Sequence, residues 1–411
     1  MTIQQQIKLE QDLLRFFLDH TNWTEGSPGY GLTIDHSENP TKMTIAATGF
    51  LLSGLAIADE RGLLTRGDVL HKVLGILKTL NTVETFHGFF PHFLDNHTGQ
   101  RRGHCEYSTI DSVILFAGLL TIDSYLQNKD VSNQVQHLLN QVNWEEFVST
   151  TTGKTQLRMS YNPDKGGDYV EGKPGYISRW SMFAEQLLMY PMIAGLIPDE
   201  DLARKLYQGF DRTAVPYRDG ILIYPPHNTL FIYHLPLLWL DASKADQDGI
   251  NWVQNAVLGT MSHIDSSRAH AQSYRSFQEG YFGMNASDSR NGYRVFGALP
   301  NIEDKLDTDG TIAPVSIIGS LPYVPREAEQ ALSMMFAMPG LYGPYGFYDA
   351  FQIEEKTPWI CSKYYALNKG MELLTLDLLS HRTVQQAFMN HPIIRQGCRR
   401  IGIPLSNNEV I

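Results

Sequence analysis

Cysteine and basic residues are scarce in this chain. Its 411 residues include only three cysteines, Cys105, Cys361 and Cys398, which are odd in number and too widely spaced for a disulfide framework or a CxxC zinc knuckle. Lysine and arginine number 33 against 44 aspartates and glutamates, so the net charge is −11. This balance argues against binding nucleic acid or anionic lipid through a broad basic surface and favours a neutral or cationic ligand.

The sequence also lacks the short motifs that hold nucleotides, metals or activated nucleophiles. No GxGxxG, Walker loop, GxSxG elbow or HExxH helix is present. Four of the 14 histidines fall within eighteen residues, and two of the gaps between them suit a zinc-binding pair. No cysteine pair accompanies them, and their glycine, proline and aromatic neighbours suit sugar hydroxyls equally well. We therefore expect no metal and no cofactor at these positions: His87, His92, His97 and His104.

Long hydrophobic runs are missing as well. The first twenty residues carry five charges, which excludes the hydrophobic region of a signal peptide there. The longest uncharged stretch, 221–240, contains three prolines and two histidines, which argues against a membrane span. We expect a soluble protein of the cytoplasm, or of the periplasm if the natural chain carries a leader.

Helical periodicity dominates what is present, because apolar residues recur at spacings of three and four while alternating patterns are short. Segments 44–58 and 108–122 are apolar on nearly every side, whereas 66–80 has one apolar stripe. Alternation of these two kinds predicts an inner and an outer layer, so we expect a mainly α protein: a single (α/α)6 barrel, or toroid, in one domain of residues 1–411. The expected helices are 4–19, 42–58, 66–80, 108–127, 131–147, 178–194, 199–209, 229–243, 248–267, 312–320, 325–338, 362–379 and 383–390.

Four connections, 81–107, 149–177, 269–311 and 339–361, are too long for simple bundle turns. We expect them to lie at one end of the barrel and to form a substrate cleft. They mix carboxylates, aromatic rings and small residues, a mixture that suits sugars, because rings cover pyranose faces and carboxyl pairs act on glycosidic bonds. The alternative is that many of these rings are core, since 11% of the chain is aromatic.

Two carboxylates are the candidate catalytic pair. Glu185 lies in an apolar segment, where burial would raise its pKa and keep it protonated as a general acid requires. A buried ion pair with Arg179 is the alternative. Asp349, in a loop rich in glycine and tyrosine, is the candidate base and is expected to stay ionised there; its alternative role is a helix N-cap.

Other carboxylates are weaker candidates. Glu106 and Asp111 flank residues that can cap the helix that follows, so they are expected to face a ligand or to support the cap. Asp288 and Asp309 are loop carboxylates for which an Asx turn is the alternative.

Taken together, these segments resemble the glucoamylase-like (α/α)6 hydrolases that include bacterial β-1,2-glucanases and the hydrolase-like regions of cyclic β-1,2-glucan synthases. The resemblance covers about residues 10–403 and rests on an ordered set of segments. They are TIAATGFLLSGLAIADERGLLTR (44–66), GFFPHFLDNHTGQRRGHCEYSTIDSVILFAGLL (88–120), RWSMFAEQLLMYPMIAGLIP (179–198), NASDSRNGY, DGTIAPVSIIGSLPYVP and YGPYGFYDAF. The family's general acid falls on Glu185, and the position proposed for its base falls on Asp349.

The resemblance implies substrate contacts elsewhere in these segments. Aromatic contacts are expected from Phe89, Phe90, Trp180, Tyr345 and Phe347. The chain departs from the family pattern at 233–236, where Tyr233 and His234 stand, and at Asp377, where the family has Glu followed by Asn; both are expected to touch the pocket. The full set of expected substrate-binding residues is Asp95, Arg102, Glu106, Asp111, Trp180, Tyr233, His234, Asp288, Tyr293, Asp309, Tyr345, Phe347 and Asp377.

The implied activity is hydrolysis of β-1,2-glucan, with inversion, to short oligosaccharides such as sophorose. Its partner is an oligo- or polysaccharide, without nucleic acid or membrane. A non-catalytic β-glucan-binding toroid, a transglycosylase and another toroid enzyme of carbohydrates are the alternatives that the sequence leaves open.

Overall fold

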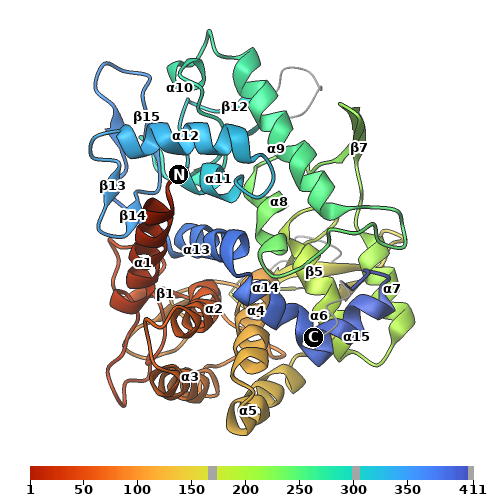
Figure 1. Ribbon diagram of the computed structural model, residues 1–411. Helices are drawn as coiled ribbons and strands as arrows, with labels where there is room; N and C mark the ends of the chain where they lie inside the picture. The colour runs from red at the N-terminus through yellow and green to blue at the C-terminus, as the bar shows by residue number, and fades with distance from the viewer. Residues whose placement is uncertain (165–173, 299–305, 406–411) are drawn as a thin grey trace.

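A computed structural model of the protein describes residues 1–164, 174–298 and 306–405, and most of its regular structure is helical (Figure 1). Parts of the connections 149–177 and 269–311 lie outside the described residues. The α-helices are α1 Ile3–Asp19, α2 Ile45–Glu60, α3 Arg66–Leu80, α4 Thr109–Leu126, α5 Lys129–Asn140, α6 Met189–Leu196, α7 Glu200–Gly209, α8 Phe231–His234, α9 Trp252–Ala269, α10 Arg275–Gln278, α11 Pro314–Gly319, α12 Pro325–Ala337, α13 Ala366–Ser380, α14 Thr383–Asn390 and α15 Pro392–Arg400. Three 3-10 helices are η1 Trp144–Phe147, η2 Glu185–Leu188 and η3 Leu235–Leu238.

The strands of the described residues are short, antiparallel and grouped in small sheets. The longest, β5, pairs with β3, β4 and β6, and the others form two-stranded pairs such as β1 with β2. The strands are β1 Lys42–Thr44, β2 Phe93–Asp95, β3 Tyr107–Ser108, β4 Val148–Ser149, β5 Gln156–Tyr161, β6 Tyr176–Arg179, β7 Ala214–Tyr217, β8 Gly220–Ile223, β9 Ala286–Ser287, β10 Arg294–Val295, β11 Gly297–Ala298, β12 Leu306–Asp307, β13 Tyr342–Gly343, β14 Gly346–Phe347, β15 Phe351–Gln352 and β16 Trp359–Ile360.

Helix ends follow the local sequence signals. The hydroxyl of Thr65 accepts from the backbone of Asp68, whose carboxylate accepts in return from the backbone of Thr65, so α3 begins where the sequence predicts it. Pro325 opens α12, as its missing N–H and fixed φ favour. The observed ends of α3, α7, α12 and α14 lie within one residue of the expected ones.

Four expected helices are wrong in part, and the first of them, 42–58, begins as strand β1 and becomes helical only at Ile45. The segment 178–194 begins as strand β6, paired with β5, and becomes helical only at Glu185. The segment 229–243 is helical only in α8 and η3, where Pro236 removes a donor, and 131–147 breaks after Asn140. Helix α15, which the periodicity of the sequence did not predict, begins at Pro392, and the His391 ring accepts a hydrogen bond from the backbone of Ile393 at its start.

The inner elements contact one another in a closed order: α2, α4, η2, α8 with η3, α11, α13 and again α2. Outside them, α1, α3, α5, α9 and α12 each pack on a neighbouring inner element, and α7 packs on α6, which directly follows η2 (Figure 1). Helices α2 and α4 are buried on all sides, whereas α3 and α5 bury one stripe, as the predicted two layers require. The expectation of a mainly helical protein is confirmed.

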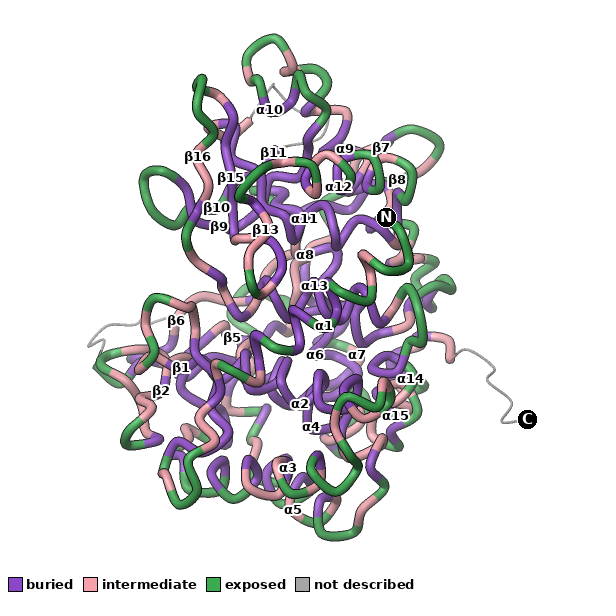
Figure 2. The backbone as a smooth tube through the Cα atoms, turned by 60° about the vertical axis from the view of Figure 1, so that its left-hand side comes forward, coloured by how far each residue is buried: buried purple, intermediate pink, exposed green. Residues whose placement is uncertain are grey.

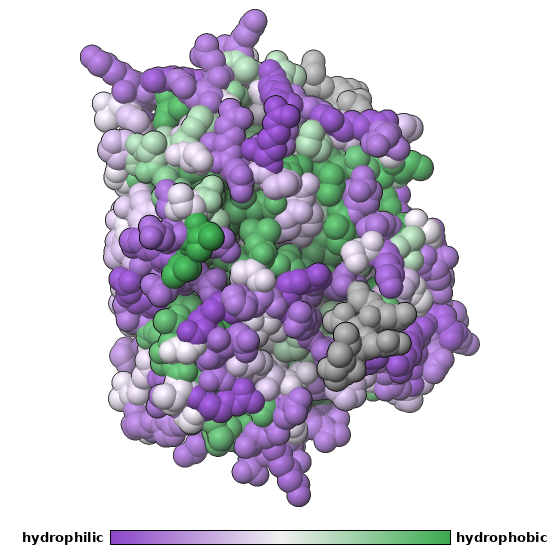
Figure 3. Space-filling model, viewed as in Figure 1, coloured by the Kyte–Doolittle hydropathy of each residue, from purple (hydrophilic) through white to green (hydrophobic). Residues whose placement is uncertain are grey.

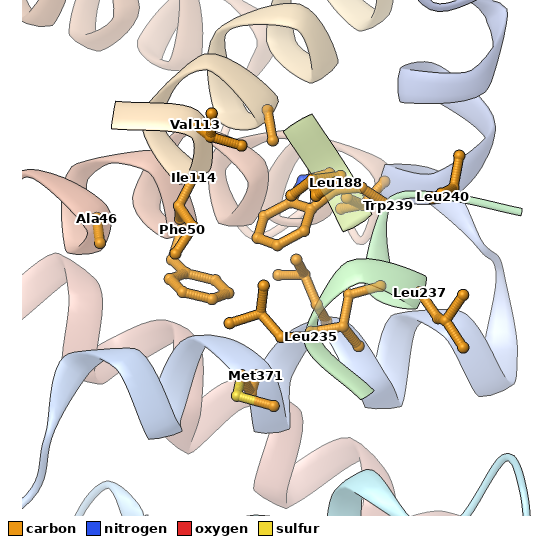
Figure 4. Packing of buried hydrophobic residues seen from close by; sticks show 14 of the residues in the cluster. Ala46, Phe50, Val113, Ile114, Leu188, Leu235, Leu237, Trp239, Leu240 and Met371 are labelled. Carbon is orange, nitrogen blue, oxygen red and sulfur yellow. The ribbon is translucent and has the colours of Figure 1, made fainter. Parts of the chain in front are cut away.

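Large apolar side chains fill the space among the inner elements (Figure 4). The ring of Phe50 on α2 lies 5.1 Å from that of Trp239, centroid to centroid, and Leu188, Leu235 and Met371 lie around the same space. The Trp239 indole N–H donates to Ser53 at 3.1 Å, so its polar atom is satisfied within the core. The space among the inner elements is thus filled with packed side chains.

Helices α2 and α4 approach closely at two glycines. A Cβ on Gly118 would lie 2.2 Å from the backbone oxygen of Gly49, and a Cβ on Gly49 would lie 2.3 Å from that of Ile114. Any larger residue at either position would force the helices apart.

Helix α4 is long and apolar enough to cross a membrane by length and composition, the one such helix among the residues searched. Of its 18 residues, 78% are buried inside the protein, which is the property of a core helix. The protein face shown in Figure 3 is mostly hydrophilic, with apolar side chains gathered near its middle, where α11 and α13 lie in Figure 1.

The short strands precede the inner elements along the chain. Strand β1 ends directly before α2, β3 directly before α4, and β6 shortly before η2. Pairing of β1 with β2 sets Thr44 opposite Phe93, and many of the strands gather along one side of the molecule (Figure 2). The long connections therefore meet at the N-terminal ends of the inner elements.

Candidate active site

A cavity of about 420 Å³ lies at these N-terminal ends. Its walls come from Thr44 and Ala46 of β1 and α2, Asp111 of α4, Glu185 of η2 and Asn368 of α13. The volume is in the range of small-ligand sites. A depression of similar size beside α3 and a smaller one beside α14 lack this grouping of carboxylates with several aromatic rings.

Glu185 is the first residue of η2, after Ala184 in extended backbone, and this turn brings its carboxyl to the cavity wall. Burial raises the pKa of Glu185 to about 7, and the negative charge of Asp111 adds to the effect. Among the described residues Glu185 has no ion-pair partner. Arg179 instead donates to Thr151, so the structure does not show the alternative pairing of Glu185 with Arg179.

A carboxylate, imidazole and carboxylate lie in a row beside Glu185. His92 Nδ1 is 2.8 Å from Glu106 Oε1, and its Nε2 is 3.6 Å from Asp111 Oδ1. Burial alone would lower the pKa of His92, but the charge of Asp111 and the hydrogen bond with Glu106 outweigh it and raise the pKa to about 9. The same hydrogen bond lowers the pKa of Glu106. Asp111 also accepts the Ser108 hydroxyl at 2.5 Å, so it supports the helix cap while it lines the cavity.

Asp349 lies behind the cavity wall. Its Oδ1 accepts from the Asn368 amide at 2.7 Å and its Oδ2 from the Asp288 backbone at 2.8 Å, and it is 2% exposed. The loop is less polar than the sequence indicated. Burial raises the pKa of Asp349 to about 6, although these hydrogen bonds and the charge of nearby Lys369 lower it. Asp349 caps no helix, so its alternative role is wrong.

Asp288 and Tyr293 come from one loop. Asp288 is buried outside the cavity lining and forms an ion pair with Lys363, whose Nζ donates to it at 2.8 Å. Tyr293 lines the cavity, with its ring centroid 5.4 Å from that of Tyr365.

Several expected polar contacts lie outside the cavity lining. Asp95 accepts from the backbone of His97 in an Asx turn, and Arg102 donates to Thr41. Asp309 accepts from the backbone of Thr311, which is the Asx turn given as its alternative.

Of the two departures from the family pattern, Asp377 lies outside the lining, whereas the segment 233–236 reaches the cavity through Leu235, with Tyr233 and His234 outside it. His234 is buried, with Nε2 3.0 Å from the Thr260 hydroxyl, and burial lowers its pKa to about 3. Asp377 accepts from Arg61 at 2.9 Å, and Arg61 also donates to Glu10 at 2.7 Å, which ties α13 to α1.

The expected aromatic contacts mostly belong to the core. Phe89, Phe90 and Phe347 are at most 1% exposed, and none of them lines the cavity. Two others satisfy their polar atoms inside the protein, since Trp180 donates to Thr109 and Tyr233 to Asn228, and Tyr345 donates to the exposed Asp19 away from the cavity lining. The alternative assignment of these rings to packing is therefore closer to the structure.

The sequence did not indicate several other lining residues. They lie before or in strands β1 and β2 and at the starts of α8 and α13: Asp35, His36, Lys42, Phe93, Phe231, Tyr365 and Asn368. They share no common spacing from the predicted helix starts, so the sequence carried no single signal for them. Among the described residues, no group of three or more His, Cys, Asp or Glu could hold a metal ion.

Comparison with known proteins gives the family. Residues 177–392, just over half of the chain, match the family model Glycoamylase, described as "Putative glucoamylase". A curated relative, an exo-β-1,2-glucooligosaccharide sophorohydrolase acting at the non-reducing end, from Parabacteroides distasonis, is 23% identical over 417 residues. That match covers 92% of this chain and 56% of the relative, so the chain spans about half of the relative's length.

Solved structures give the same fold. The endo-β-1,2-glucanase of Chitinophaga pinensis, in complex with sophorotriose and glucose, has a TM-score of 0.83 at 21% identity, with 98% of each chain covered. A putative glucoamylase of Bacteroides uniformis has a TM-score of 0.82 at 22% identity, covering 97% of this chain and 96% of that one. The resemblance found in the sequence is confirmed, and the chain belongs to the Glycoamylase family of putative glucoamylases.

Proposed function

We propose that the protein is a glycoside hydrolase that cleaves β-1,2-linked glucan. One observation carries this: Glu185 stands at a cavity wall without an ion-pair partner among the described residues, with its pKa raised to about 7 beside the carboxylate of Asp111. A carboxyl that holds a proton near neutral pH next to an ionised one is what acid catalysis at a glycosidic bond needs. The relatives named for β-1,2-glucans and sophorose support the substrate class.

In the proposed reaction Glu185 gives its proton to the leaving oxygen as the glycosidic bond breaks. Water attacks the anomeric carbon from the other face and loses its proton to Asp349, which inverts the configuration. Asp349 lies behind Asn368, so the proton passes through a water or a sugar hydroxyl, and each Asp349 oxygen keeps a lone pair to receive it. Lys369 supports the ionised form by lowering the pKa of Asp349.

The fold proposed to carry this reaction is a single (α/α)6 barrel over residues 1–411. It is supported by the closed order of the six inner elements and by the outer helices, five packed on those elements and α7 packed on α6, which directly follows η2. The proposed substrate cleft includes the cavity at the N-terminal ends of the inner elements and is wider than that cavity.

Product analysis tests the proposal. Purified protein is incubated with linear β-1,2-glucan and, separately, with β-1,3-, β-1,4- and α-1,4-glucans, and the anomer first released is followed by proton NMR. Release of sophorose or short β-1,2-oligosaccharides with the α-anomer is expected. Binding without turnover would indicate a glucan-binding toroid, products longer than the substrate a transglycosylase, and equal turnover of another linkage would remove the β-1,2 assignment.

A further inference from the structure

His92 is the one imidazole on the cavity wall with a carboxylate oxygen within 4 Å of each ring nitrogen in the described part of the chain. Glu106 lies on one side and Asp111 on the other. A neutral imidazole has one N–H and one bare nitrogen, and a bare nitrogen facing an ionised carboxylate would be repulsive. The geometry is satisfied when both nitrogens carry a proton.

The ring is also held in place. It stacks on Phe93 with centroids 3.8 Å apart and 19° between the planes, and the Nδ1 contact with Glu106 fixes its rotation. Phe93 is in turn covered by Lys42 Nζ, 3.5 Å from its centroid. His92 therefore presents a fixed edge to Asp111.

We propose that His92 is a permanently charged positioning residue that keeps Asp111 ionised and aimed into the cavity, so that the single mobile proton of the wall stays on Glu185. This inference rests on the proposed hydrolase function and assigns neither a base nor a metal ligand to His92. Asp111 is held at its second oxygen by Ser108, so its charge has a fixed place next to Glu185. Without a cation at His92, Asp111 would compete with Glu185 for that proton.

All the charged groups facing His92 are consistent with this arrangement. Glu106 precedes β3, Asp111 is on α4, Asp35 and Lys42 line the wall beside β1, and Glu185 is on η2. Asp35 pairs with Lys42 at 3.0 Å, which leaves Glu106 and Asp111 as the partners of the imidazolium.

The test has two arms, and the first needs no substrate. Nitrogen-15 NMR of the histidines in the wild-type protein, assigned by comparison with His92→Gln, reports the protonation of each ring nitrogen. Both nitrogens of His92 should be protonated at pH 7.5. A neutral ring at that pH overturns the proposal whether or not the protein cleaves glucan.

The second arm measures kcat/KM on β-1,2-glucan against pH. Removal of the cation beside Asp111 makes the neighbouring carboxyls Asp111 and Glu185 hold their shared proton more tightly, so His92→Gln should move the alkaline limb, set by this pair, upward by about one unit. His97→Gln, in the same segment with an exposed side chain, is the matched control and should leave the profile in place. A His92→Gln profile lowered by a constant factor, with both limbs unmoved, would mean a purely structural role and would refute the proposal. If neither protein cleaves the glucan, the function fails while the NMR arm still decides the charge of His92.

Discussion

Replacing Glu185 by Gln should lower activity and raise stability in the same protein. Its pKa is about 7 in the folded state against 4.5 for an ordinary Glu. At about 1.4 kcal/mol per pH unit, this shift of the pKa corresponds to a loss of about 3 kcal/mol in the free energy of unfolding when the carboxyl ionises in the folded protein. Because the carboxyl is partly exposed at the cavity, we expect the loss to be about 2 kcal/mol.

The sign of the pH dependence follows from which state binds the proton. Between pH 4.5 and 7 the folded protein holds a proton on Glu185 that the unfolded chain has lost, so wild-type stability falls as pH rises through that window. Gln cannot ionise. The variant should match the wild type at pH 4 and exceed it by about 2 kcal/mol at pH 8, while its turnover falls by about 10²–10⁴ because the acid is gone.

Urea unfolding at several pH values and initial rates on β-1,2-glucan measure both effects. Glu329→Gln, an exposed carboxyl on α12, is the matched control and should change neither. Equal stability of Glu185→Gln and wild type at pH 8 would show that Glu185 ionises freely. Turnover above about a tenth of the wild-type value in a folded variant would remove it as the acid.

Four further outcomes are expected. Asp349→Asn should lose at least about 10² in turnover, and the wild-type kcat/KM should fall below pH 6, where Asp349 takes up a proton. Lys369→Met leaves buried Glu372 without its ion-pair partner at 2.6 Å and should lower the free energy of unfolding by about 3 kcal/mol at pH 8. The loss should be smaller at pH 6, because the pKa of Glu372 is about 7 and the carboxyl is then mostly neutral; a loss independent of pH would contradict this. Gly118→Ala should cost about 3 kcal/mol in urea unfolding, since its Cβ would lie 2.2 Å from Gly49 O, and no loss would mean that the helices separate freely. Dialysis against EDTA should leave the rate on glucan unchanged, and activity restored only by an added metal would refute this.

Much of the fold could be predicted because long helices carry their own signals. The all-round apolar composition of α2 and α4 indicated an inner layer, and Thr65 and Pro325 marked two starts. The short inner elements could not be predicted this way. Whether Tyr176–Arg179 forms a strand depends on pairing with β5, a tertiary interaction that the periodicity of the segment does not contain.

The site was predicted where a residue type was unusual for its surroundings. A lone Glu185 among apolar residues pointed to a perturbed carboxyl, and the structure places it on the wall. Aromatic residues such as Phe90 and Phe347 gave no such contrast, because core and sugar platform require the same side chain. His92 was visible as one histidine among four, but its two carboxylate partners become evident only when β2 and α4 are brought together.

The ion pair between Arg61 and Asp377 has a consequence for synthesis of the chain. It joins residues 316 positions apart, close to where α13 completes the ring against α2. At about 5–20 residues per second, a ribosome needs about 15–60 s to extend the chain from the end of α2 to α13. Throughout that interval the all-round apolar α2 has no final partner on that side, and contacts of such sequence separation form slowly. We therefore expect nascent chains that stop before residue 366 to aggregate or to require a chaperone, whereas chains that include α13 become soluble.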